Sequence, residues 1–203
     1  MDDLSWLGLL FWLMFTHSDG ITNFAVIMTA QKLGPDYSHR FFKAIRKMVY
    51  EMPPGWVFSL IWVCIYPLIA VAIFLYWKNS LDSVHWYDSV IAVYAVNIIL
   101  NHLWWVLFFM KSPDSKRNKH FFNYYVDVKY YGLWLAAIDT LLIYGTSLYV
   151  LIRFGISHAW VSFGLYIIYP IWLTFATWLS IRILWFVEDG RLDGHLSMRH
   201  SSS

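Results

Sequence analysis

Long apolar runs separated by shorter polar stretches dominate the chain. The clearest run begins at Pro53 and Pro54 and continues without a charged residue to Trp77, where Lys78 ends it. The two prolines suit the first turn of a helix, where a missing N–H group has no partner to lose. At ~1.5 Å per residue, an uncharged run of about 25 residues crosses a bilayer core of roughly 30 Å. The pattern therefore predicts a transmembrane helix over residues 53–77.

Three later runs have comparable length and predict further transmembrane helices over about 86–110, 130–152 and 159–187. A first apolar run over 4–30 is interrupted near its middle by a polar belt that contains Asp19. Two interpretations fit this run, a short hairpin or one long helix. Because its first apolar part is too short to span a bilayer alone, we expect one helix, with Asp19 facing protein or water.

These runs predict an all-α membrane protein with a bundle of five transmembrane helices. We expect residues 1–203 to form this one domain, with a polar C-terminal tail over 188–203. Composition agrees, since 59% of the 203 residues are hydrophobic and 14% are charged. A water-soluble domain of this size could not bury so much apolar surface.

The positive charges are distributed unevenly between the two sides of the expected bundle. Loops 31–52 and 111–129 and the C-terminal side carry all lysines and arginines except Lys78 and Arg153. Because cytoplasmic loops are enriched in Lys and Arg, we expect these loops and the C-terminus to be cytoplasmic and the N-terminus outside. Basic residues beside membrane spans are explained by topology and lipid headgroups, so we expect membrane lipids as partners and no nucleic acid.

A polar stripe runs along the span expected over 86–110. Tyr94, Asn97, Asn101 and Trp104 follow one another at helical spacing and share one face. An amide side chain in lipid needs a partner, so the stripe should face the bundle interior. Two interpretations remain open, hydrogen bonding between helices and the polar wall of a ligand cavity.

Aromatic rows on two other spans favour a cavity for a flat apolar guest. Trp56, Trp62 and Tyr66 lie on one span, and another span carries Tyr169, Trp172, Phe175, Ala176 and Leu179 at helical spacing. Aromatic stripes are usually packing, but large rings beside small residues also suit a flat ligand.

Asp139 is a lone acid within a span. It is either protonated, paired with Asn97, Asn101 or His17, or functional.

Enzyme signatures are absent from the sequence, which shows no metal-ligand spacing and no glycine-rich phosphate loop. We therefore predict no catalytic residue, no metal site and no required cofactor. His17 and His102 lie within spans and could ligate a haem iron, but such histidines are more often packing residues.

Three ordered motifs resemble a known membrane family. They are Pro53-Pro54-Gly55-Trp56-Val57-Phe58 with Trp62 and Tyr66, then Asn101 to Phe109, then Tyr169 to Leu179. Together they resemble the translocator protein or tryptophan-rich sensory protein family (TspO/MBR, peripheral benzodiazepine receptor-like). Glu51 stands where this family usually carries the tryptophan that helps to close its ligand pocket.

The resemblance implies a helical bundle, commonly a homodimer, that binds tetrapyrroles (porphyrin or haem) and sterols such as cholesterol in a cavity open toward the first loop. Transport, sensing and porphyrin degradation are activities ascribed to the family. We therefore expect an integral membrane ligand-binding protein for transport or sensing. The alternatives are a light- or oxygen-dependent porphyrin-degrading enzyme and a scaffold that docks partners through its basic loops. We expect the mitochondrial outer membrane if the source is eukaryotic, and otherwise a cell or other organelle membrane.

The predicted ligand-binding residues are Trp56, Trp62, Tyr66, Tyr94, Asn97, Asn101, Trp104, Trp172, Phe175 and Ala176. Further polar residues expected at the pocket are Asp19, Asp139, Arg46 and Lys47. Ala92 and Ala95 are a candidate dimer face, because small residues let membrane helices approach closely.

Overall fold

The structure, a computed structural model, describes residues 6–18, 45–46, 49–79, 89–109, 120–121, 124–125 and 131–188. The second half of the expected first helix (19–30, with Asp19), Lys47 and residues 189–203 of the expected tail lie outside the described residues.

In the described part of the chain the fold is an all-α membrane bundle of five helices, with α6 and α7 counted as one, as the hydropathy pattern predicts. Its long helices are α3 (Gly55–Asn79), α4 (Ser89–Phe109), α5 (Tyr131–Ile156) and, after a short α6 (Trp160–Tyr166), α7 (Ile168–Glu188). An apolar helix, Trp6–Ser18, precedes them. Two short strands, β1 (His120–Phe121) and β2 (Tyr124–Tyr125), pair antiparallel between α4 and α5.

Four of the helical segments are long and apolar enough to cross a membrane, with α6 and α7 counted together. Many of their large apolar side chains point outward, among them Val63, Ile99, Ile138 and Ile171. In water such a surface would drive aggregation, whereas lipid is as apolar as these side chains. The protein is therefore an integral membrane protein.

The division between α6 and α7 has a local cause. Pro170 has no N–H group, so the carbonyl of Tyr166 loses its usual helical partner four residues later. Ile167 keeps helical backbone angles, and its N–H group still bonds to the Phe163 carbonyl at 3.0 Å. The two segments therefore continue one span, and the sequence-based expectation of one span over 159–187 is consistent with this pair.

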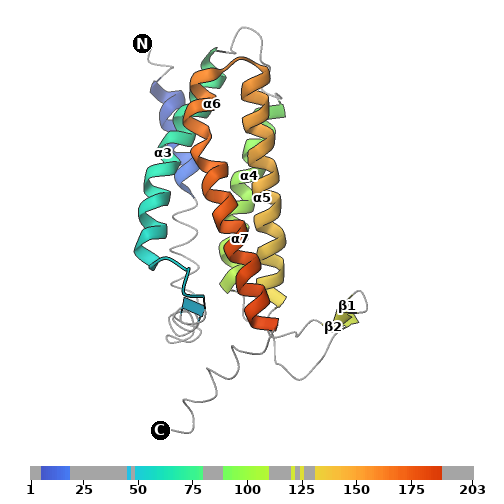
Figure 1. Ribbon diagram of the computed structural model, residues 1–203. Helices are drawn as coiled ribbons and strands as arrows, with labels where there is room; N and C mark the ends of the chain where they lie inside the picture. Colours follow the sequence, from blue (N-terminus) through green and yellow to red (C-terminus); the bar gives the residue numbers. More distant parts are fainter. Residues whose placement is uncertain are drawn as a thin grey trace.

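The helices pack unevenly around the bundle. α4 lies along α5, α5 lies along α7, and α3 lies along α6, whereas α3 and α7 approach each other at few points. Figure 1 shows α3 diverging from α7 toward the end at which α3 begins and α4 and α7 finish. We call this the lower end and the opposite end the upper end. Among the described helices, α3 is therefore held mainly at its upper end.

Two groups of buried apolar side chains fill the bundle. The larger group joins Ile69 and Ile73 of α3 to Tyr94, Phe154 and Tyr166, and it includes the first helix through Trp12. The smaller group lies at the lower end and brings together Ile45, Val49, Met52, Leu179 and Ile183. The residues before α3 therefore pack against α7 from below.

The first helix approaches α3 closely at Gly8. A Cβ atom added at Gly8 would lie 2.7 Å from the Trp77 ring and 3.4 Å from the Phe74 ring. We expect Gly8→Leu to destabilise the protein by about 1–3 kcal/mol, the usual cost of overpacking. The measurement is thermal or SDS-induced unfolding in detergent.

Gly145→Leu is the matched control, because an added Cβ at Gly145 meets nothing within 4 Å among the described residues. Equal stability of the two variants would contradict the close contact between the first helix and α3.

Candidate ligand site between α3 and α7

Six aromatic side chains occupy the space between α3 and α7. We call them the aromatic seam, and they are Phe58, Trp62 and Tyr66 of α3 with Tyr169, Trp172 and Phe175 of α7. Each set recurs about every three to four residues, so each lies on one helical face.

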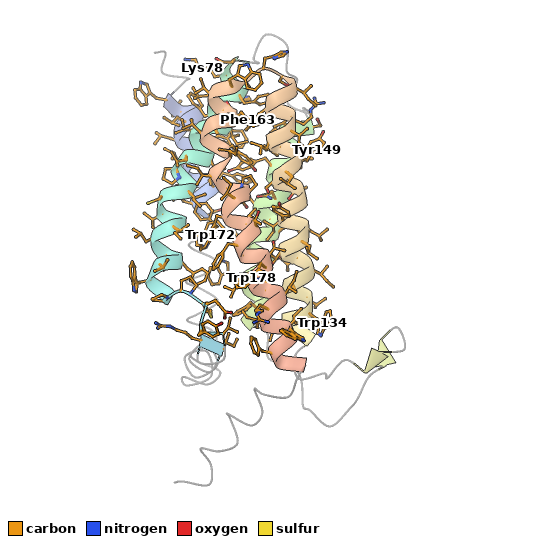
Figure 2. The ribbon with its side chains drawn as sticks, viewed as in Figure 1. Lys78, Trp134, Tyr149, Phe163, Trp172 and Trp178 are labelled. Carbon is orange, nitrogen blue, oxygen red and sulfur yellow. The ribbon has the colours of Figure 1, made fainter. Side chains whose placement is uncertain are left out.

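The rings of the seam meet mostly edge to face. The Trp62 ring lies 6.2 Å from Tyr169 and 6.4 Å from Trp172, centroid to centroid. Phe58 lies 5.6 Å from Trp172, and Trp172 lies 5.3 Å from Phe175. Figure 2 shows Trp172 between the ribbons of α3 and α7. Side-chain rings rather than close backbone packing therefore join these two helices.

A hydrogen-bond network fixes the α7 side of the seam. The Tyr169 hydroxyl donates to Asn97 Oδ1 at 2.8 Å and accepts from Asn101 Nδ2 at 2.9 Å. Asn97 Nδ2 donates to the Ile143 carbonyl at 2.8 Å and to Thr146 Oγ1 at 2.7 Å. One buried cluster thus ties α4 to both α5 and α7.

This network shows what the polar stripe on α4 does in the structure. Asn97 and Asn101 are both buried and bonded to neighbouring helices, which is the first of the two interpretations that the sequence left open. Tyr94 is also buried, and its hydroxyl meets Thr16 of the first helix at 2.5 Å. Asn97 and Asn101 thus hold Tyr169 of the seam in place, and Tyr94 ties α4 to the first helix.

Trp56 lies away from the seam, and Trp104 is not one of its rings. Trp56 is 67% exposed at the start of α3, because it stands two residues from Phe58 and so faces about 200° around the helix. Trp104 stacks on Phe108 at 4.8 Å within α4. It also packs, partly buried, against the same two buried groups as the seam residues Trp62, Trp172 and Phe175. The structure therefore places Trp62, Tyr66, Trp172 and Phe175 in the seam, Trp104 against the buried groups that the seam shares, and Trp56 on the outside.

The remaining predicted residues have varied positions. Ala176 is partly buried on α7, and its carbonyl accepts a bond from Ser180 at 2.9 Å. Arg46 is exposed. Asp139 is 3% exposed, and neither carboxyl oxygen has a hydrogen-bond partner in the described part of the chain. The pairing of Asp139 with Asn97, Asn101 or His17 considered from the sequence is thus not seen.

The two intramembrane histidines take part in local and interhelical bonds. His17 Nδ1 lies 2.7 Å from the Leu13 carbonyl, and the His17 ring meets Tyr66 edge to face at 5.8 Å. His102 Nδ1 lies 2.6 Å from the Ile98 carbonyl, and its Nε2 lies 3.0 Å from Ser18 Oγ. This pattern is typical of histidines that pack helices together.

An ion pair closes the lower end of the site. Arg182 of α7 lies 3.7 Å from Glu51, just before α3, and its guanidinium stands over the rings of Trp185 and Phe186. Neither Arg182 nor Tyr169 is among the ligand-binding residues predicted from the sequence, although Tyr169 begins the aromatic motif of the last span. A charged residue within an apolar span is a signal of function that could have identified Arg182.

A separate small cavity lies between α4, α5 and α7, with a volume of about 10 Å³ and a lining that includes Phe108, Ala137 and Ser180. This is roughly the space that one water molecule needs. It is far too small for a flat organic guest, so the candidate site that the described residues offer is the seam.

Tyr169 offers a test of the network. We expect Tyr169→Phe to reduce the free energy of unfolding by about 1–2 kcal/mol, because it leaves the buried amides of Asn97 and Asn101 with one partner fewer. SDS-induced unfolding would measure the loss. Tyr149→Phe is the control, since the Tyr149 hydroxyl bonds to Ser89 at an exposed position, and a loss as large as that of Tyr169→Phe would contradict a special role for the buried network.

Comparison with known proteins agrees with this architecture. The TspO/MBR family matches residues 20–186, which is most of the chain. The tryptophan-rich protein TspO of Archaeoglobus fulgidus is 38% identical over 63 residues, or 30% of this chain and 39% of the archaeal protein. The match therefore spans less than half of that relative's length, and no solved structure matches the chain. Because the family match covers the helices that form the seam and its network, the chain belongs to the TspO/MBR family of membrane translocator and sensory proteins.

Proposed function

We propose that this protein binds a flat, largely apolar guest between α3 and α7, for transport or sensing. Tetrapyrroles such as porphyrin or haem and sterols such as cholesterol are the guests with the right shape. The observation that carries the proposal is the aromatic seam, in which large rings bridge two helices whose backbones meet at few points.

The seam offers a guest both apolar contact and a polar handle. The Trp172 indole N–H is buried and has no hydrogen-bond partner within the described residues. A buried indole N–H normally finds a partner. An acceptor atom on the guest would supply that partner, while the rings of Trp62 and Phe175 cover its faces.

Binding requires the seam to open, because its rings contact one another between α3 and α7. The rigid side is α7, which the Tyr169 network holds to α4 and α5. The yielding side is α3, which packs along α6 above and diverges from α7 below (Figure 1). We therefore infer that a guest enters from the lower end by displacing α3 and its rings.

The distribution of charge and the outward apolar side chains support a proposed membrane orientation and proposed partners. The lower end carries the basic loops, so we place it in the cytoplasm and the N-terminus outside. Membrane lipids cover the outward apolar side chains, and a second copy of the chain is the proposed protein partner. If the source is eukaryotic, we propose the mitochondrial outer membrane as its location.

Ligand titration tests the proposal. We expect protoporphyrin, haem or cholesterol to change the tryptophan fluorescence of the purified protein and to saturate below about 100 μM. Trp62→Ala and Trp172→Ala should each weaken binding roughly tenfold, equal to about 1.4 kcal/mol, because each removes a ring from the guest's contact surface.

Trp160→Ala is the matched control, because Trp160 is 62% exposed at the start of α6 in the upper half of the molecule. If none of the three ligands shows saturable binding, the proposal is overturned. Equal losses at Trp160 and Trp172 would mean that binding is nonspecific.

The orientation has its own test. In a Cys64→Ser background, a membrane-impermeant maleimide added outside intact cells should label Lys78→Cys and spare Tyr50→Cys. Both positions are exposed, Tyr50 at 82%, and they lie at opposite ends of α3. Labelling of Tyr50→Cys alone would reverse the proposed topology.

A further inference from the structure

Arg182 is a cation within the lower part of an otherwise apolar helix. Its guanidinium carbon lies 4.8 Å from the Trp185 ring centroid and 4.9 Å from that of Phe186. Its side chain is 27% exposed, so it is neither fully buried nor free in solution. Contacts of this kind hold a guanidinium in place through the negative faces of the rings.

Arg182 lies on the same face of α7 as the seam. Trp172, Phe175 and Arg182 recur at helical spacing, because Phe175 follows Trp172 by three positions and Arg182 follows Phe175 by seven. At ~1.5 Å per residue, Arg182 lies about 10 Å below Phe175 along the helix axis. A guest seated on the seam would therefore have its lower edge toward Arg182.

The carboxylate that faces Arg182 is poorly matched to it. Glu51 Oε1 is 3.7 Å from Arg182 Nη2, which is longer than a charge-assisted hydrogen bond of about 2.8 Å. The second oxygen, Oε2, is buried and has no hydrogen-bond partner among the residues that the structure describes. The pair thus lacks the two parallel bonds that make an Arg–carboxylate interaction strong.

We propose that Arg182 is the residue that recognises an acidic group on the guest, and that Glu51 occupies this position until a guest carboxylate replaces it. The inference rests on the proposed function and deepens it, because it assigns a preference for carboxylated tetrapyrroles over neutral guests of the same shape. The sterols considered above carry no acid, so they gain nothing from Arg182.

Replacement of Glu51 by a guest carboxylate at Arg182 is favourable on physical grounds. A guest carboxylate is free to orient for two bonds to the guanidinium, whereas Glu51 is held by a backbone whose neighbours Val49 and Met52 are buried. The displaced Glu51 side chain is already 25% exposed at the lower end, so it can turn toward water. No proton needs to move in this step.

The test compares two probes that share one ring system, protoporphyrin IX and its dimethyl ester. Affinity is measured by tryptophan quenching on the full-length protein in nanodiscs. We expect Arg182→Gln to weaken binding of the diacid at least tenfold and to leave the ester within about twofold, because only the diacid loses a charge-assisted contact. We expect Glu51→Gln to strengthen diacid binding about threefold or more, since the competing charge is gone.

Lys78→Gln is the matched control, a cation removed at the opposite end of α3 (Figure 2). It should leave the affinity of both probes unchanged. Ester binding by each variant also reports whether the site is still folded.

The outcomes separate the two proposals. If neither probe binds the unaltered protein, the proposed function and the inference both fail. A second outcome is that both probes bind the unaltered protein while Arg182→Gln weakens diacid and ester binding to the same extent, or weakens neither. In that case the guest site stands and the role of Arg182 is overturned. If Arg182→Gln does not fold, Glu51→Gln decides, and unchanged or weaker diacid binding by that variant overturns the inference.

Discussion

The need to satisfy polar groups inside the membrane organises this bundle. Asn97 and Asn101 are costly in lipid unless they are bonded, and the structure gives them the Tyr169 hydroxyl, Thr146 and the Ile143 carbonyl as partners. These bonds connect α4 to α5 and α7 at one level of the bundle. Three helices therefore form a rigid unit, and this unit presents the α7 half of the aromatic seam.

The fourth long helix is held differently. α3 packs against α6 and the first helix at the upper end, whereas among the described residues it meets α7 at few points, where aromatic rings contact one another. Dispersion contacts between rings are easier to rearrange than a buried hydrogen-bond network. The contrast between a bonded side and a packed side supports our proposal that α3 can move away from α7 to admit a guest while the rest of the fold stays in place.

Under our proposal, charge adds a second level of selection at the lower end. This chain pairs Glu51 with Arg182 at the position where the family resemblance implied a tryptophan. An aromatic lid would favour any apolar guest. An ion pair that a guest can replace would instead favour a guest with its own acid.

The sequence by itself determined the membrane environment and four of the spans, because uncharged runs of bilayer length have no other stable place in a protein of this size. Helical spacing alone also placed Asn97 and Asn101 on one helix face, and Trp62 and Tyr66 on another. Spacing did not show whether Asn97 lines a cavity or bonds to a neighbouring helix, because the partner of Asn97 depends on which atoms of α5 and α7 lie opposite it. Trp56 illustrates the same limit, as its motif suggested a pocket while the turn of the helix directs it outward. Arg182 and Glu51 are 131 positions apart in the chain, and only the packing of the segment before α3 against α7 brings their charges together.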